Sequence, residues 1–245
     1  MSQYLRYFVI NLLSLFTFTL NEDTETYEIS AANDIMIDII LPQEYEGKYP
    51  KGHTLNHQCV GYVDDAFRKF FAKHENEEWF RNTIFVFVAD HVSSEKMTEV
   101  FRRSPGDYHI MGFMYAPDSA LFGEHHQVVS QIDIMPTLLG LMGNSKPYFA
   151  FGRDIFNEHA DVPFAVNYDN NAYQAITHDH LVRFDEKSVT GIYAIDDIMH
   201  EHNLVGKLSM EGVEQNLKAL VQSYYSRVEN KDYVVHDSVS RDSDF

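Results

Sequence analysis

The stretch NTIFVFVADH, residues 82–91, decides how this chain folds. Its inner part, Thr83–Ala89, is a continuous run of β-branched and aromatic residues, which is typical of a strand buried on both faces in a parallel sheet. Asp90 and His91 follow the run directly. Because ligands in open α/β sheets bind outside the carboxyl ends of the strands, the sequence predicts that these two side chains lie at a functional edge.

Asp90 and His91 combine a hard carboxylate oxygen with an imidazole nitrogen. This combination suits a divalent ion such as Mn²⁺ or Zn²⁺, so the pair is a candidate metal site. The alternative interpretation is an aspartate that caps the next segment beside a surface histidine. Ser93 and Ser94 lie close by, but the sequence offers them no evident base partner, so no serine nucleophile is predicted.

Regular secondary structure is predicted on both sides of this stretch. Before it, apolar residues recur at helical spacing with charged residues between them, which indicates an amphipathic helix. After it, Gly143 is a plausible carboxyl cap for a second helix. The predicted elements are a short strand at 35–41, a helix at 55–74, a turn at 76–82 anchored by Trp79 and Phe80, a strand at 108–117, a helix at 128–143, short strands at 163–168, 180–187 and 190–196, and a closing helix at 217–228.

The amino-terminal run YFVINLLSLFTFTL, residues 7–20, is mostly apolar and carries no charge. It is shorter than the roughly 18–20 residues that cross a bilayer, so no transmembrane helix is predicted. Arg6 precedes the run as in a signal peptide, but no small-residue cleavage site follows it. Two interpretations stay open: a targeting segment, or a buried helix end followed by a core strand at 16–20.

Composition limits the partners of the chain. Hydrophobic residues make up 44% of it, which is a globular composition. The formal net charge of −18, with no evident cluster of Lys and Arg along the sequence, argues against nucleic acid as a partner. The single cysteine, Cys59, excludes an intrachain disulfide and a zinc site built from cysteines.

Several segments, in this order along the chain, resemble the sulfatase-like branch of the alkaline phosphatase superfamily. The resemblance is closest to the lipoteichoic acid synthase group of phosphoglycerol transferases and covers about residues 51–235. It rests on CVGYVDDAFRKFF (59–71), NTIFVFVADH (82–91), YHIMGFMYAP (108–117), QIDIMPTLLGLMG (131–143) and PYFAFGRDIF (147–156).

The resemblance implies an α/β fold with a mostly parallel sheet flanked by helices. The chain would hold the carboxy-terminal half of such a domain, with a closing set of short strands and a terminal helix. Residues 1–235 are then expected to form a partial sulfatase-like domain, and residues 236–245 a flexible tail.

The resemblance also implies metal-dependent transfer or hydrolysis of a phosphoester or sulfoester on a lipid or a cell-envelope glycan. Asp90 and His91 match the family's Asp-His metal ligands, with Mn²⁺ expected first and Zn²⁺, Mg²⁺ or Ca²⁺ as alternatives. Full-length relatives are expected on the extracytoplasmic face of the cell membrane.

Two family features have no match here. No segment matches the Thr nucleophile with its acidic co-ligand, and no Ser-His-x-Pro-Phe motif follows the strand at 16–20. We therefore expect no catalytic residue and no turnover from this chain alone. The alternative function is an inactive fragment that acts as a scaffold or binding module.

Other polar residues are weaker candidates. His53 and His57 flank the start of the first helix and are expected to be surface or cap residues. The pair His125–His126 and the run His178–Asp179–His180 have the residue types of metal sites, but adjacent side chains alternate between faces of a strand or loop, so both groups are expected to be solvated. Asp133, near Gln131, is expected to cap a helix rather than to act in catalysis.

Overall fold

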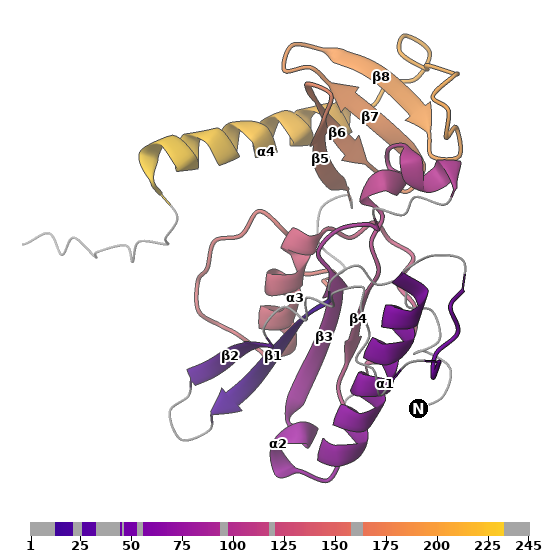
Figure 1. Ribbon diagram of the computed structural model, residues 1–245. Coiled ribbons are helices and arrows are strands. Elements are labelled where there is room, and N and C mark those ends of the chain that lie inside the picture. Colours follow the sequence, from indigo (N-terminus) through magenta and orange to yellow (C-terminus); the bar gives the residue numbers. More distant parts are fainter. Residues whose placement is uncertain are drawn as a thin grey trace, which may run out of the picture. The chain divides into compact units, whose positions relative to one another are not determined.

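The computed structural model describes residues 13–21, 26–32, 45, 47–52, 56–93, 98–117, 121–157 and 164–232. It divides into two compact units, residues 1–124 and 125–245, and each is described by itself (Figure 1). We call them the amino-terminal unit and the carboxy-terminal unit.

A four-stranded sheet forms the centre of the amino-terminal unit (Figure 1). Its strands are β1 (Leu13–Asn21), β2 (Thr26–Ala32), β3 (Thr83–Ala89) and β4 (Gly112–Tyr115), in the order β2-β1-β3-β4. The predicted strand at 83–89 is confirmed, five of its seven residues are buried, and it lies between two neighbours. The predicted strand at 108–117 is shorter than expected.

The expected parallel pairing is wrong for this sheet, because every described ladder in it is antiparallel. A run of β-branched and aromatic residues reports that both faces of a strand are buried, but it carries no information about the direction of the neighbours. Between β3 and β4 the chain forms two short 3₁₀ helices, η3 (Glu99–Arg102) and η4 (Gly106–Tyr108). The described part of this connection contains no α-helical crossover of the kind that joins parallel strands.

Helix α1 (Asn56–His74) confirms the amphipathic helix predicted at 55–74. Its apolar stripe packs against β3: Phe67 meets Phe87 with ring centroids 5.3 Å apart, and Phe71, one turn later, meets Phe85 at 5.1 Å. The contacts run backwards along the strand, so α1 is antiparallel to β3. The amino-terminal turns of α1 therefore lie toward the carboxyl end of β3.

The core of this unit is aromatic. It consists of Val63, Phe67, Phe71, Phe80, Phe85 and Phe87. Each side chain of this kind contributes about 1.5–3 kcal/mol when it is fully buried, so this cluster is the main support of the strand end that follows. The predicted turn at 76–82 contains the single helical turn α2 (Glu78–Arg81), in which Phe80 is buried while Trp79 remains 37% exposed.

In the carboxy-terminal unit, the helix predicted at 128–143 begins later than expected. A 3₁₀ turn, η5 (Gln131–Asp133), leads into α3 (Ile134–Leu141). Gly143 has φ of +69° and ends the helix as predicted, because glycine adopts this left-handed conformation without the steric cost of a side chain.

The short strands predicted near the carboxyl end form an antiparallel meander of β5 (Ala165–Asp169), β6 (Ala172–Ile176), β7 (His180–Phe184) and β8 (Val189–Ala194). Strand β6 had no separate prediction. The signal for it is the pair Asn170–Asn171, with φ of 49° and 59°, which suits the two-residue turn of a hairpin.

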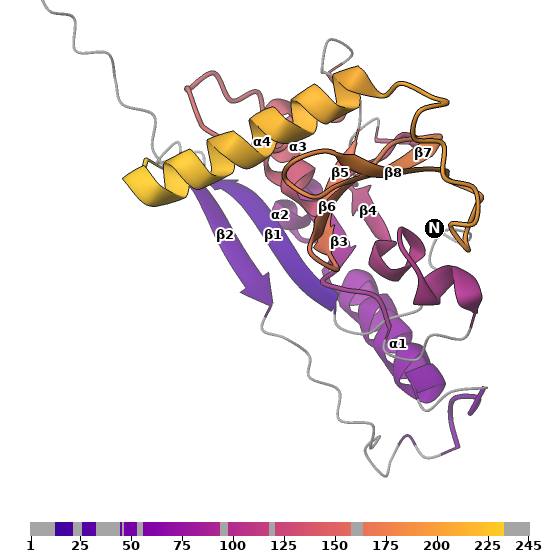
Figure 2. The same ribbon diagram turned by 90° about the horizontal axis from the view of Figure 1, so that it is seen from above.

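Helix α4 (Glu211–Asn230) is longer at both ends than the predicted helix at 217–228. Val213 and Leu217 pack into the core of the meander with Ala175, Val182, Phe184 and Ile192. The carboxyl end of α4 extends beyond the meander (Figure 2).

The strand predicted at 16–20 is confirmed as part of β1, whereas residues 7–12, the strand predicted at 35–41 and the tail at 236–245 lie outside the described residues. Among the helices that the structure describes, none combines the length and apolar character needed to cross a bilayer.

Candidate metal centre

Asp90 and His91 lie where the sequence predicted them, directly after the carboxyl end of β3 and between the neighbouring strands β1 and β4. Their side chains are 34% and 64% exposed, so solvent and small ions reach both. The strand end itself is fixed, since Phe87 and Ala89 are buried and the Ala89 N–H donates to the carbonyl of Met111 at 3.1 Å.

Hydrogen bonds with the local backbone hold the two side chains. The backbone N–H of His91 donates to Oδ1 of Asp90 at 2.8 Å. Nδ1 of His91 lies 2.7 Å from the carbonyl oxygen of Val92. A carbonyl oxygen accepts only, so Nδ1 must carry the proton and donate it. In the neutral ring, Nε2 is therefore the nitrogen with the lone pair.

That nitrogen faces the second carboxylate oxygen: Nε2 of His91 lies 3.4 Å from Oδ2 of Asp90. Two acceptors at this separation repel each other unless a proton or a cation lies between them. The separation fits a shared cation, because two ligands about 2.1 Å from a tetrahedral zinc lie about 3.4 Å apart. The Val92 carbonyl plays the part of the outer hydrogen-bond partner that fixes the tautomer of a metal-binding histidine.

The pair supplies two ligands. Within the described ranges, no group of three or more His, Cys, Asp or Glu side chains lies close enough to hold a metal ion. Neither Asp90 nor His91 lines the two surface cavities described, one along α1 and one between β8 and α4. The residues present fit part of a cation site, and a closed site needs further ligands.

Comparison with known proteins shows what this chain is similar to. The family model described as Sulfatase matches residues 26–144. Lipoteichoic acid synthases from Staphylococcus aureus strains, such as USA300 and NCTC 8325, are 25% identical to this chain over 169 residues, which are 64% of this chain and 24% of each synthase. A protein in the alkaline phosphatase superfamily from Vibrio parahaemolyticus, known from its crystal structure, superposes with a TM-score of 0.59 at 22% identity, covering 80% of this chain and 47% of that one.

The chain is therefore similar in sequence to sulfatases and lipoteichoic acid synthases, and similar in fold to a protein of the alkaline phosphatase superfamily. The resemblance seen in its motifs is confirmed, as is the α/β fold. It spans about a quarter of the length of the S. aureus synthases. Superfamily members generally depend on metal ions, and the segment that the family model matches includes Asp90 and His91.

The other histidine candidates in this sulfatase-like chain do not form comparable sites. His178 and Asp179 lie in the turn between β6 and β7, each 75% exposed, with Nε2 and Oδ1 3.9 Å apart. The His125 ring packs on Phe156 at 4.8 Å. His57 is exposed at the start of α1, and His53 and Ser94 lie outside the described residues.

Asp133 is structural, as predicted. Its side chain is buried, and its oxygens accept the backbone N–H groups of Ser130 at 2.8 Å and Arg153 at 2.9 Å. The first bond belongs to a capping box at the start of η5. The second joins the motif at 131–143 to the motif at 147–156.

The same two motifs meet at further points. Oγ1 of Thr137 accepts the N–H of Ile155 at 3.1 Å. A Cβ added to Gly152 would lie 2.0 Å from the carbonyl oxygen of Ile132, so the close approach requires glycine. The segments 131–143 and 147–156 therefore hold one another in place within the carboxy-terminal unit.

Asp65 on α1 is a charged centre that the sequence reasoning missed. Its side chain is 10% exposed, and it accepts from Tyr49 OH at 2.9 Å and pairs with Lys48 at 3.1 Å, Lys69 at 2.9 Å and Arg68. Arg68 first, then Lys69, Lys48 and Tyr49, hold the pKa of Asp65 far below its usual range. The signal in the sequence was the spacing of Asp65, Arg68 and Lys69 at i, i+3 and i+4.

Proposed function

We propose that Asp90 and His91 provide two ligands to a divalent cation in a domain that transfers or hydrolyses phosphoesters. The observation that carries this proposal is the pair of acceptors held 3.4 Å apart, Oδ2 of Asp90 and Nε2 of His91. The Val92 carbonyl orients the imidazole, and the His91 N–H orients the carboxylate. The geometry of the pair and the similarity to sulfatases and lipoteichoic acid synthases support the same role.

The chemistry follows from the charges. A bound divalent cation would stabilise negative charge on a phosphoryl or sulfuryl group during its transfer. Asp90 supplies a negative charge that holds the cation, and His91 supplies a neutral donor whose ring cannot rotate without losing its bond to Val92. Mn²⁺ is the cation that we propose first and Zn²⁺ the second, since carboxylate oxygens suit Mn²⁺ and imidazole nitrogens suit Zn²⁺.

The similarity to lipoteichoic acid synthases favours phosphoglycerol transfer on a lipid or a cell-envelope glycan. It also favours the outer face of the cell membrane as the place of action in full-length relatives. Both are proposals for this chain, because it spans about a quarter of those relatives.

Calorimetric titration with Mn²⁺ and with Zn²⁺ tests the site. We expect weak binding to the unaltered chain, because two protein ligands leave the other positions to water. The Asp90→Ala and His91→Ala variants should each lose at least about tenfold in affinity, which corresponds to about 1.4 kcal/mol. The His178→Ala variant, which alters an exposed Asp-His pair of the same chemistry, should bind like the unaltered chain. Equal affinity in all four proteins would contradict the proposal.

A turnover assay separates an enzyme from the alternative, a binding module or scaffold. With Mn²⁺ and either nitrophenyl phosphate or nitrophenyl sulfate, the chain alone should show no turnover, because no residue in it matches the family's nucleophile. Hydrolysis that disappears in Asp90→Ala would contradict this expectation and would show that a side chain of this chain or a cation-bound water acts as the nucleophile.

A further inference from the structure

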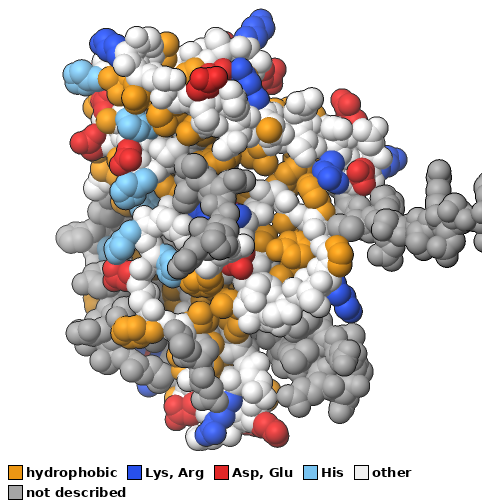
Figure 3. Space-filling model, turned by 180° about the vertical axis from the view of Figure 1, so that it is seen from behind, with side chains coloured by type: hydrophobic (Ala, Val, Ile, Leu, Met, Phe, Trp, Pro, Cys, Tyr) orange, Lys and Arg blue, Asp and Glu red, His pale blue; other side chains and the backbone are white. Residues whose placement is uncertain are grey.

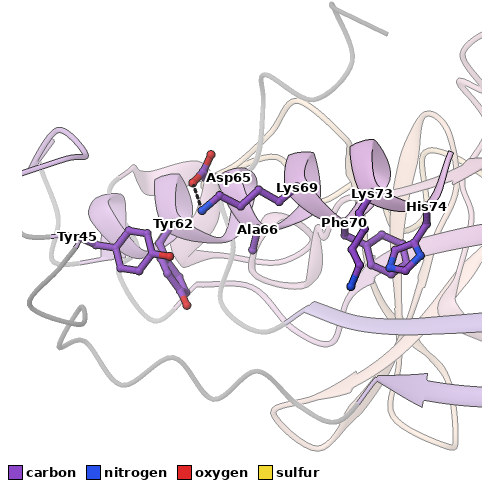
Figure 4. A pocket seen from close by; sticks show the side chains of 8 residues that line it. All are labelled: Tyr45, Tyr62, Asp65, Ala66, Lys69, Phe70, Lys73 and His74. Carbon is purple, nitrogen blue, oxygen red and sulfur yellow. Dashed lines mark ion pairs between the residues drawn. The ribbon is translucent and has the colours of Figure 1, made fainter.

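A second feature of the amino-terminal unit lies along the outer side of α1. A cavity of about 340 Å³ is lined there by Tyr45, Tyr62, Lys69, Phe70, Lys73 and His74, with Asp65 and Ala66 completing its wall (Figure 4). Its volume lies at the lower end of the range of small-molecule sites. Asp65 is its one acidic residue in the part of the chain that the structure describes.

The surroundings of this cavity are positively charged, although the chain as a whole is negatively charged. The whole chain carries −18, and on the face shown in Figure 3 the Lys and Arg side chains are scattered among acidic and uncharged ones. Around Asp65, three cations share one carboxylate: Lys48, Arg68 and Lys69. Two positive charges therefore remain after pairing with Asp65, and Asp64, which interacts with Arg68, offsets one of them. Lys73 adds a further positive charge along the same cavity.

The exposed Lys and Arg side chains have N–H groups beyond those that bond to Asp65. The side chains of Lys48, Arg68 and Lys69 are 46%, 65% and 52% exposed, and an ammonium group has three N–H donors, of which the bond to Asp65 uses one. Lys69 reaches back along α1 to Asp65, whereas Lys73 extends away from it (Figure 4). Among the described residues, Lys73 has no ion-pair partner.

The aromatic side of the cavity is ordered by ring contacts. Tyr45 meets Tyr62 edge-on at 4.8 Å, and the ammonium group of Lys69 lies 5.3 Å from the centre of the Tyr45 ring. At the other end, the His74 ring lies between Phe70 at 4.9 Å and Trp79 at 5.4 Å. Its Nδ1 is buried and has no hydrogen-bond partner among the described residues. Buried polar atoms are seldom left unpaired, so this end of the cavity has an unused donor or acceptor.

We propose that this cavity binds the phosphate group of a small phosphorylated ligand, through Lys69 and Lys73, with the rest of the ligand against Tyr45 and Tyr62. Surplus positive charge and free N–H donors beside apolar rings match a phosphate attached to a sugar or polyol. The source of the phosphate is either a soluble ester or the headgroup of an anionic phospholipid. This site uses none of the residues of the candidate metal centre.

The test measures phosphate binding without metal. In EDTA, hexose phosphate is titrated into the unaltered chain by calorimetry, with unphosphorylated hexose as the ligand control. We expect binding of the phosphate ester alone, and about a tenfold loss in Lys73→Glu, the order expected for one charge-assisted hydrogen bond. Lys207→Glu, which makes the same change in net charge at an exposed residue of the other unit, should leave binding unchanged. Unaltered melting of Lys73→Glu shows that the variant folds.

A second arm identifies the source. Flotation with vesicles containing phosphatidylglycerol is compared with flotation with neutral vesicles. If the chain floats with phosphatidylglycerol vesicles but does not bind hexose phosphate, and Lys73→Glu removes the flotation, the ligand is a lipid headgroup. If the chain binds hexose phosphate in the calorimetric titration, the ligand is a soluble ester. No binding in either arm, or equal losses in Lys73→Glu and Lys207→Glu, overturns the proposal. Asp90→Ala should lose metal affinity and keep phosphate affinity, so the two sites fail or succeed separately.

Discussion

Two carboxylates of the amino-terminal unit, Asp65 and Asp90, meet opposite surroundings. Asp65 lies among three cations and a tyrosine hydroxyl, with its side chain 10% exposed. Asp90 is 34% exposed and faces Nε2 of His91, while the proton of the neutral ring lies on Nδ1. Asp65 is thus surrounded by cations of the protein, whereas Oδ2 of Asp90 and the lone pair of His91 face each other.

The difference shows why an acidic residue alone does not indicate a metal site. A carboxylate already paired with cations gains little from a metal ion, because the metal ion would have to displace them. A carboxylate beside a second acceptor gains directly from a cation. The neighbouring residues therefore decide whether an acid can bind a metal ion. His91 follows Asp90 directly, whereas Arg68 and Lys69 lie three and four residues after Asp65.

Both carboxylates depend on the aromatic core between α1 and β3, and removing Phe85 breaks that support. Phe85 is fully buried and contacts Phe71 and Phe80 at 5.1 Å and 4.9 Å. Phe85→Ala should cost about 3–5 kcal/mol in the free energy of unfolding. Urea denaturation followed by tryptophan fluorescence measures it, because Trp79 is the one tryptophan in the chain and lies against this core. Tyr168→Ala, at an exposed position, serves as the control, and a loss below about 1 kcal/mol in Phe85→Ala would show that the core is not the support.

The pH dependence of stability sharpens the comparison. The pKa of Asp65 is depressed in the folded state, so its contribution is complete above the usual aspartate pKa of about 4 and is lost as the pH falls below it. Asp65→Asn should therefore destabilise the unit at pH 7, and the difference from the unaltered chain should shrink toward pH 2. Urea transitions at both pH values measure this, and an equal difference at both would contradict the account.

The adjacent Asp64 provides a control, because its pKa is shifted in the opposite direction. Burial, and then Asp65, raise the pKa of Asp64. An acid whose folded-state pKa is raised costs stability as the pH rises, so Asp64→Asn should leave the unit slightly more stable at pH 7 and unchanged at pH 2.

The sequence predicted the elements whose pattern is local. The helical spacing of Phe67 and Phe71 predicted α1, and the run at 83–89 predicted β3 and the place of Asp90 and His91. The sequence wrongly predicted parallel neighbours for β3, because a strand can be buried on both faces whether its neighbours are parallel or antiparallel. Strand β2 went unpredicted although Tyr27, Ile29 and Ala31 alternate with polar residues in the sequence, a period that the acidic composition around it obscured.

The site was predictable only in part. The residue types at 90 and 91 indicated a metal, but the orientation of the imidazole depends on where the carbonyl of Val92 points, which no residue pattern reports. The Asp65 cluster was missed because Lys48 and Tyr49 come from a segment before α1, so half of the cluster forms only when the chain folds.

The most direct test of the claim that Asp90 and His91 bind a cation determines which nitrogen of His91 carries the proton and which one binds the metal ion. Nitrogen-15 NMR of the imidazole rings, assigned with His91→Ala and recorded with and without Zn²⁺, gives the tautomer and the metal-binding nitrogen. The account predicts a protonated Nδ1 in neutral His91, and a shift of its Nε2 with Zn²⁺ that Asp90→Ala removes while the His178 signals stay unchanged. A proton on Nε2 in the neutral ring, or a zinc-induced shift at His178 as large as that at His91, would contradict it.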